Sequence, residues 1–102
     1  MKRYDKLVRD RLPEIIMRQG GKPSFHRVHG EALKKYARAK ILEEAKEYEK
    51  SGDAEELADL LEAIFFCCKL ENISWEEMNA KMQEKRTERG GFEGGIILES
   101  AE

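Results

Sequence analysis

Four carboxylates occur as two pairs, each with the spacing of one helical turn. Glu44 and Glu47 are three residues apart, and Glu56 and Asp59 repeat this spacing after a short interruption. Residues three apart lie on the same side of an α-helix, so each pair presents both carboxylates on one face. If the two helices form a hairpin, the four carboxylates converge, and they would repel one another unless a divalent cation lay among them.

The ligand type indicates which cation such a site would hold. Neither pair has a neighbouring His or Cys in the sequence, and a site built from carboxylate oxygens alone favours Mg²⁺ or Mn²⁺ over Zn²⁺. Because Mg²⁺ commonly keeps water ligands and binds phosphates, the pattern points to a nucleotide as the bound molecule.

The same residues also have a purely structural explanation, which the sequence leaves open. Glu56 can complete a capping box with Asp53, and Glu44 and Glu47 can lie at the surface in ion pairs with lysines such as Lys40. Lys40 shares the helical stripe of these glutamates, so it fits either an ion pair or a phosphate contact.

Two long helices are predicted to carry the carboxylate pairs. Residues 31–50 contain no Gly or Pro, and Ser51 and Gly52 interrupt the pattern before Asp53 begins a second helix. This order predicts a tight helical hairpin. The apolar positions of both helices recur at intervals of three or four: Leu33, Ala37, Ile41, Ala45 and Tyr48 in the first, and Leu57, Leu60, Leu61, Ile64 and Phe65 in the second.

Shorter elements are predicted on either side of the hairpin. Asp10 can cap a helix of about two turns that places Ile15 and Ile16 inward and ends at Gly20. Ser74 and Glu77 form the pattern of a capping box, which begins a helix that ends at residues 90–91.

The predicted fold class is mainly α, with two short strands at residues 22–28 and 92–99 that could pair. The apolar stripe of the second long helix is wider than one partner helix can cover. We therefore expect a homodimer or homotetramer that completes a four-helix core.

Length and composition predict one small domain, residues 1–102. The chain is 40% hydrophobic and 39% charged, and no apolar run approaches the roughly 20 residues that span a bilayer. Its first residues have mixed charge, unlike a signal peptide, and the adjacent Cys67 and Cys68 cannot form a framework of long-range disulfides. We expect a cytoplasmic protein with buried thiols and no membrane partner.

Charge divides the chain into a basic and an acidic part. Residues 1–42 carry 12 Lys and Arg against 4 Asp and Glu, whereas residues 43–77 carry 3 against 12. This division disfavours binding to a nucleic-acid polymer and suggests that the two parts face each other or share a ligand. Lys6, Arg9 and Arg11 are expected to dock on the acidic hairpin by ion pairs, with contact to phosphate as the alternative.

Aromatic residues and histidines carry weaker expectations. Phe65 and Phe66 can line a base pocket but are more typical of a core or dimer interface, and Trp75 is a better candidate for stacking on a base. His26 and His29 have no neighbouring Cys or carboxylate, so we expect surface histidines and no zinc site.

Three motifs together resemble a known superfamily. Glu43-Glu44-x-x-Glu47 followed by Glu56-x-x-Asp59 resembles the signature of the MazG-like, all-α nucleoside triphosphate pyrophosphohydrolases, which include phosphoribosyl-ATP pyrophosphohydrolase and dimeric dUTPases. The segments YDKLVRDRLPEII and KRTERGGFEGGIIL resemble the end motifs of small stand-alone members described as phosphoribosyl-ATP pyrophosphohydrolase-like. The resemblance covers nearly the whole chain.

The resemblance implies a Mg²⁺-dependent hydrolysis of a nucleotide between its α- and β-phosphates, which yields a nucleoside monophosphate and pyrophosphate. Such a reaction would suit the clearing of non-standard or surplus nucleotides. The residues implied are Glu44, Glu47, Glu56 and Asp59 as metal ligands, Glu43 and Glu44 as catalytic groups, and Lys40, Lys85, Arg86 and Arg89 as triphosphate ligands.

Alternatives remain for individual residues and for the function as a whole. Glu43 can orient the attacking water or face solvent, and the basic residues near Gly90 can simply complement a helix C-terminus. The protein as a whole can instead be a non-catalytic nucleotide- or metal-binding regulatory module, or a helical protein-interaction domain whose acidic face meets a basic partner.

Overall fold

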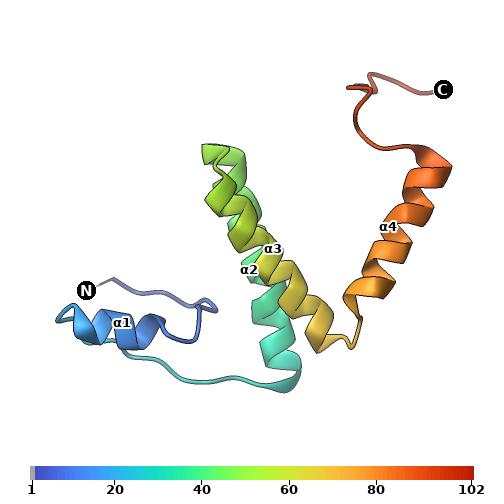
Figure 1. Ribbon diagram of the computed structural model, residues 1–102. Helices are drawn as coiled ribbons and strands as arrows, with labels where there is room; N and C mark the ends of the chain where they lie inside the picture. Colours follow the sequence, from blue (N-terminus) through green and yellow to red (C-terminus); the bar gives the residue numbers. More distant parts are fainter. Residues whose placement is uncertain (1) are drawn as a thin grey trace.

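Four helices make up the regular structure of the described residues. The computed structural model describes residues 2–102 and contains α1 (Leu12–Arg18), α2 (Gly30–Ser51), α3 (Ala54–Leu70) and α4 (Trp75–Arg89) in that order (Figure 1). The mainly α fold class predicted from the sequence is therefore confirmed.

The α2–α3 hairpin is the centre of the fold. Gly52 separates the helices with a φ of 70°, a left-handed conformation that glycine adopts without steric cost, and its N–H donates to the Tyr48 carbonyl at 2.8 Å. A two-residue connection leaves α3 no route except back along α2. This is the only extensive contact between helices in the described chain, and the predicted hairpin is confirmed.

Small side chains fill the interface between α2 and α3. Ala37 is 1% exposed, and Ala63 and Cys68 from α3 are also buried. Side chains this short let the two backbones approach closely, which places the polar groups beside them within reach of the opposite helix. Cys68 is thus a buried free thiol, as predicted, whereas Cys67 is partly exposed.

The first helix differs in detail from its prediction. Arg11, not Asp10, occupies the N-cap of α1, and no side chain caps the helix. Pro13 lies in the first turn, where its missing N–H costs no intrahelical hydrogen bond. The prediction that Ile15 points into a core is wrong, because α1 makes no extensive contact with another helix and leaves Ile15 36% exposed.

One of the two predicted capping boxes forms. The Glu77 N–H donates to Ser74 Oγ at 3.1 Å and the Ser74 N–H donates to Glu77 Oε1 at 3.4 Å, which confirms the box at α4. Asp53 occupies the N-cap of α3, but its side chain accepts no capping bond and Glu56 does not complete a box. The structural explanation of Glu56 as a capping partner is therefore wrong.

The two predicted strands are not formed within residues 2–102. Segments 22–28 and 92–99 have no strand hydrogen bonds, and Figure 1 shows them in different parts of the molecule. A strand exists only with a hydrogen-bonded neighbour, and neither segment has one in the single chain. In the tail, the apolar side chains of Phe92, Ile96, Ile97 and Leu98 are 80–99% exposed.

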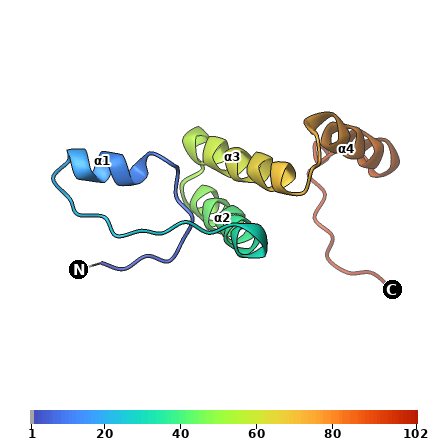
Figure 2. The same ribbon diagram turned by 90° about the horizontal axis from the view of Figure 1, so that it is seen from below.

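The fold is extended and exposes unusually much surface. The accessible surface is 9521 Å², whereas a folded monomer of 11.8 kDa exposes about 5,900 Å². The radius of gyration is 17.7 Å, against about 13 Å for a compact domain of this length. Figure 2 shows the cause, since α4 and the tail project beyond the hairpin, and α4 makes no extensive helix contact with it.

None of the helices in residues 2–102 combines the length and the apolar character that a bilayer span requires.

A substitution at the hairpin interface tests its close packing. Because Ala37 has almost no free space around it, we expect Ala37→Leu to lower the free energy of unfolding by about 1–3 kcal/mol, measured by urea denaturation. Ala32→Leu, at an exposed position of the same helix, is the control and should change stability by less than about 0.5 kcal/mol. Equal effects of the two variants would contradict this packing.

Candidate functional site

Three of the four predicted carboxylates meet near the turn of the hairpin. Glu44 of α2 and Glu56 and Asp59 of α3 each place one carboxylate oxygen within 4.8 Å of the others. We call these residues the acidic cluster. Glu47 is exposed and is not one of the three. An α-helix turns by about 100° per residue, so Glu47 lies about 60° around α2 from Glu44, although its carboxylate still acts on Glu56.

Crowding of negative charge is strongest at Glu56. Burial raises the pKa of the Glu56 carboxyl, and the nearby carboxylates of Asp59, Glu47 and Glu44 raise it further. Glu44 is only 7% exposed although it is a glutamate. A carboxylate in this position needs compensation by a cation or hydrogen-bond donors, and Lys40 provides it.

Lys40 bridges the acidic cluster and Glu43. Its Nζ lies 3.2 Å from Glu44 Oε1 and 3.0 Å from Glu43 Oε2, and its side chain is 19% exposed. Burial lowers the pKa of Lys40, but hydrogen bonds to Glu43 and Glu44 outweigh this effect and the net pKa is raised. The expected ion pair is therefore present, with the ammonium group held beside the cluster.

Glu43 is held by two lysines. Its Oε2 accepts from Lys40 and, at 3.2 Å, from Lys6 of the N-terminal segment. Burial raises the pKa of Glu43, whereas the bonds to Lys40 and Lys6 lower it, and the net pKa is lowered. Glu43 thus stays ionised between the two ammonium groups, next to the acidic cluster but outside it.

The basic N-terminal segment docks on the hairpin through Lys6 and Arg9, as predicted, whereas Arg11 forms none of the ion pairs found within residues 2–102. We call residues 2–11 the N-terminal arm. Lys6 reaches Glu43 of α2, and Arg9 Nη2 reaches Asp59 Oδ1 of α3 at 2.9 Å. The Tyr36 hydroxyl donates to Asp5 Oδ1 at 2.6 Å, which raises the pKa of Tyr36. Figure 2 shows the arm passing beside the hairpin.

The C-terminal basic residues lie apart from the acidic cluster. Lys85, Arg86 and Arg89 belong to α4, which leaves the hairpin at the end opposite its turn (Figure 1). Arg86 Nη2 pairs with Glu93 Oε2 at 2.7 Å, and Arg86 and Arg89 lie in the last helical turn, where cations complement the helix dipole. Within one chain, the structure does not bring these residues to the cluster.

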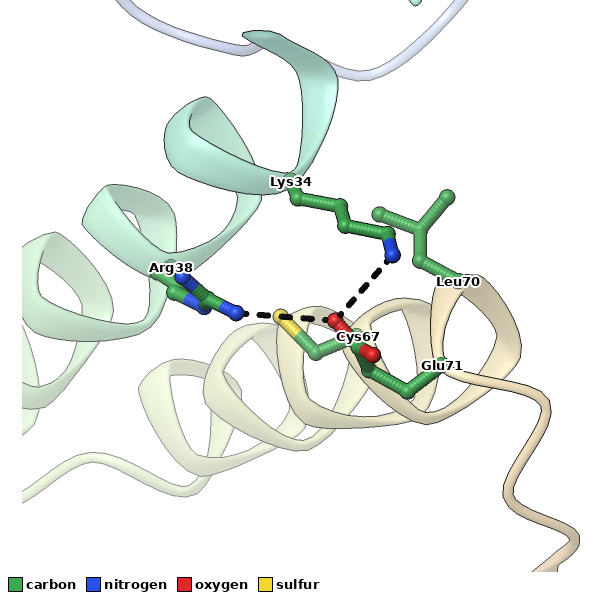
Figure 3. A pocket seen from close by; sticks show the side chains of 5 residues that line it. All are labelled: Lys34, Arg38, Cys67, Leu70 and Glu71. Atoms are coloured by element: carbon green, nitrogen blue, oxygen red, sulfur yellow. Dashed lines mark ion pairs between the residues drawn. The ribbon is translucent and has the colours of Figure 1, made fainter. Parts of the chain in front are cut away.

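A separate pocket lies at the end of the hairpin opposite its turn. Figure 3 shows Lys34 and Arg38 pointing from α2 toward Glu71, whose Oε1 is 3.7 and 3.5 Å from their nitrogens. Burial raises the pKa of Cys67, which lines the same pocket. Its volume of about 100 Å³ is far below the 300–1,000 Å³ typical of ligand pockets, and both of its cations already pair with Glu71.

Aromatic residues and histidines add no group to the cluster. The rings of Phe65 and Trp75 pack with their centroids 4.7 Å apart, and both side chains remain more than one third exposed. Trp75 therefore contacts α3 at the start of α4. His26 and His29 are exposed, and His29 occupies the N-cap of α2.

Sequence reasoning overlooked the contact between Tyr36 and Asp5. Neither residue belongs to an apolar period or to a carboxylate pair, so no local signal marks them. The charge division of the chain predicts docking of the N-terminal arm in general, but not which residues meet.

Comparison of the chain with protein-family models, with curated proteins and with solved structures found no match in any of the three.

The raised pKa of Glu56 leads us to predict how the stability of the folded protein changes with pH. The folded protein binds this proton more tightly than the unfolded chain, so the associated stabilisation is present at low pH and is lost as the pH rises through the folded-state pKa. Glu56→Gln stays neutral at every pH. We therefore expect its stability relative to wild type to increase between about pH 4 and about pH 7, measured by thermal denaturation.

Glu55→Gln is the matched control for this experiment. Glu55 lies in the same first turn of α3, so both variants lose one negative charge near the helix N-terminus. If both variants gained the same stability with pH, the effect would come from the helix terminus and not from the carboxylates around Glu56.

Proposed function

We propose that the chain catalyses a Mg²⁺-dependent hydrolysis of a nucleotide between its α- and β-phosphates, which yields a nucleoside monophosphate and pyrophosphate. The observation that carries this proposal is the acidic cluster, in which carboxylates from two antiparallel helices converge around the buried Glu44. The motif resemblance described above supports the choice of reaction.

The geometry of the cluster fits the proposed ion. Mg²⁺ binds oxygens at about 2.1 Å in octahedral geometry, which places its ligand oxygens about 3–4 Å apart. The three carboxylate oxygens lie within 4.8 Å of one another, so small rotations of these side chains would bring them to this spacing. Glu44, Glu56 and Asp59 would hold the ion, Glu47 would contribute charge from the rim, and Mn²⁺ suits the same oxygen donors.

The bound ion would supply neutralisation of phosphate charge and a water of lowered pKa. The chain's own residues would position the substrate. Lys40 is the proposed phosphate ligand, because its ammonium group is already held beside the cluster. Glu43 lies on the far side of Lys40 and would keep it oriented and charged. Lys85, Arg86 and Arg89 would reach this nucleotide only from a second copy of the chain.

Self-association is part of the proposal. The chain exposes about 3,600 Å² more than a compact monomer of its mass, whereas a standard interface buries only about 800 Å² on each partner. The apolar stripe of α3 is partly uncovered in the single chain, since Leu57 and Leu61 are each 44% exposed and Phe65 is 39% exposed. We propose that α3 packs in a homodimer or homotetramer with a four-helix core.

A cytoplasmic location and a role in clearing surplus or non-standard nucleotides complete the proposal. A regulatory module that binds nucleotide without turnover would use the same cluster, so turnover distinguishes the two functions.

Pyrophosphate release is the decisive measurement of activity. We expect release from one or more members of a panel of ribonucleoside and deoxyribonucleoside triphosphates and phosphoribosyl-ATP, in the presence of Mg²⁺ and not of a chelator. Asp59→Ala should lower the rate by about 100-fold or more, because it removes one carboxylate of the cluster and with it several kcal/mol of metal-dependent stabilisation.

Glu76→Ala is the control for activity, since Glu76 is an exposed carboxylate at the start of α4 and lies outside the cluster. It should retain the wild-type rate. Folded protein that releases no pyrophosphate but melts at a higher temperature with Mg²⁺ and nucleotide would indicate a binding module. With no thermal shift either, the acidic cluster would be only a surface feature.

A charge on the exposed stripe of α3 tests self-association. Leu61→Lys should weaken association at least about tenfold, measured by analytical ultracentrifugation, because an ammonium group would be buried in an apolar interface. Glu62→Lys, at the neighbouring exposed position, is the control for added positive charge. A wild-type chain that sediments as a monomer at all concentrations would overturn this part of the proposal.

A further inference from the structure

The N-terminal arm contacts both helices of the hairpin through three successive polar groups. Asp5 accepts a hydrogen bond from Tyr36 of α2, Lys6 pairs with Glu43 of α2, and Arg9 pairs with Asp59 of α3. The arm thus lies against the hairpin from Tyr36 in the first half of α2 to Asp59 of α3. The N-terminal arm is therefore held against the hairpin beside the acidic cluster.

One of these contacts uses a member of the acidic cluster itself. Arg9 Nη2 lies 2.9 Å from Asp59 Oδ1, so a guanidinium group already compensates part of the negative charge of Glu44, Glu56 and Asp59. A guanidinium and a divalent cation that approach the same carboxylates repel each other. Binding of one therefore disfavours binding of the other.

The ion pairs that hold the N-terminal arm on the hairpin are weak enough to be displaced. The side chains of Arg9 and Asp59 are 63% and 42% exposed, and those of Lys6 and Glu43 are 41% and 29% exposed. Ion pairs with this exposure contribute little because water and salt screen them. Glu43 also keeps its bond to Lys40 when Lys6 leaves, so release of the arm exposes no unpaired buried carboxylate.

We propose that Arg9 and a divalent cation compete for Asp59, so that cation binding at the acidic cluster releases the N-terminal arm from the hairpin. This inference rests on the proposed function, because it takes the acidic cluster as the site of the cation. It assigns the arm a regulatory role, in which the arm covers the cluster until the cation arrives and then leaves it open to the nucleotide.

The opposite role for Arg9 has the opposite consequence. Asp59 has two carboxylate oxygens and Arg9 contacts Oδ1, so a positioning arginine could orient the carboxylate while its other oxygen bound the metal. In that case removal of Arg9 would weaken cation binding. If Arg9 and the cation compete, removal of Arg9 would instead strengthen cation binding.

The affinity of the full chain for Mn²⁺ separates the two roles, with free Mn²⁺ measured by electron paramagnetic resonance. We expect Arg9→Ala to bind Mn²⁺ about two- to fivefold more tightly than wild type, the range that corresponds to loss of one exposed ion pair. Arg11→Ala is the matched control, since Arg11 lies on the same arm and forms none of the ion pairs within residues 2–102, and it should leave the affinity unchanged. Unchanged or weaker binding in Arg9→Ala would overturn the proposal.

Trypsin cleavage after Lys6 measures release of the arm directly. In wild type, Mn²⁺ should accelerate this cleavage at least about twofold, relative to cleavage after Arg89 at the distant end of α4. In Arg9→Ala the cleavage should be faster without Mn²⁺ and respond less to it. If wild type binds Mn²⁺ with no change in cleavage, the proposed release of the N-terminal arm is wrong, but the metal site is supported. If neither wild type nor Arg9→Ala binds Mn²⁺, both the metal site and the release of the N-terminal arm by a cation are wrong.

Discussion

Small side chains between α2 and α3 allow a close approach of the two helices, and the candidate site depends on that approach. Ala37 and Ala63 are buried at the interface, and the short turn at Gly52 forces α3 to run back along α2. Carboxylates from both helices therefore meet although they are far from adjacent in the sequence. Larger side chains at the interface would separate the backbones and with them the acidic cluster. Little else is buried, because no other pair of helices in residues 2–102 packs extensively.

Charge compensation around the hairpin turn follows from the same packing. Glu44 is buried where Lys40 can neutralise it, and the acidic residues left at the surface attract the basic N-terminal arm. These contacts form a gradient of exposure, from the largely buried Lys40 to the exposed Arg9. Since screening increases with exposure, the inner pair is structural and the outer pairs can exchange partners. The proposed binding of a cation and then of a nucleotide would benefit from outer contacts that break easily.

The helices predicted correctly depend on local interactions, whereas the two predicted strands depend on a partner elsewhere. Apolar periodicity predicts α2 and α3, and the reciprocal bonds of Ser74 and Glu77 predict the start of α4. Asp53 has the sequence of a capping box as well, but the side-chain geometry does not complete it. Segments 22–28 and 92–99 have the composition of strands, yet a strand requires a hydrogen-bonded neighbour that sequence composition does not supply. The same limit applies to the apolar stripe of α3, whose width indicates a partner but not which one.

For the candidate site, the sequence alone determined which carboxylates share a helical face, because a period of about 3.6 residues is a local property of the backbone. It also determined that a basic segment and an acidic segment would attract each other, because charge follows directly from composition. Tertiary structure decided which members of these groups meet. Glu56 and Asp59 join Glu44 while Glu47 stays outside these three, and Arg9 reaches Asp59. Those choices depend on the distance and rotation between α2 and α3 and on the path of the arm across them, and both are set by contacts between residues that are remote in the chain.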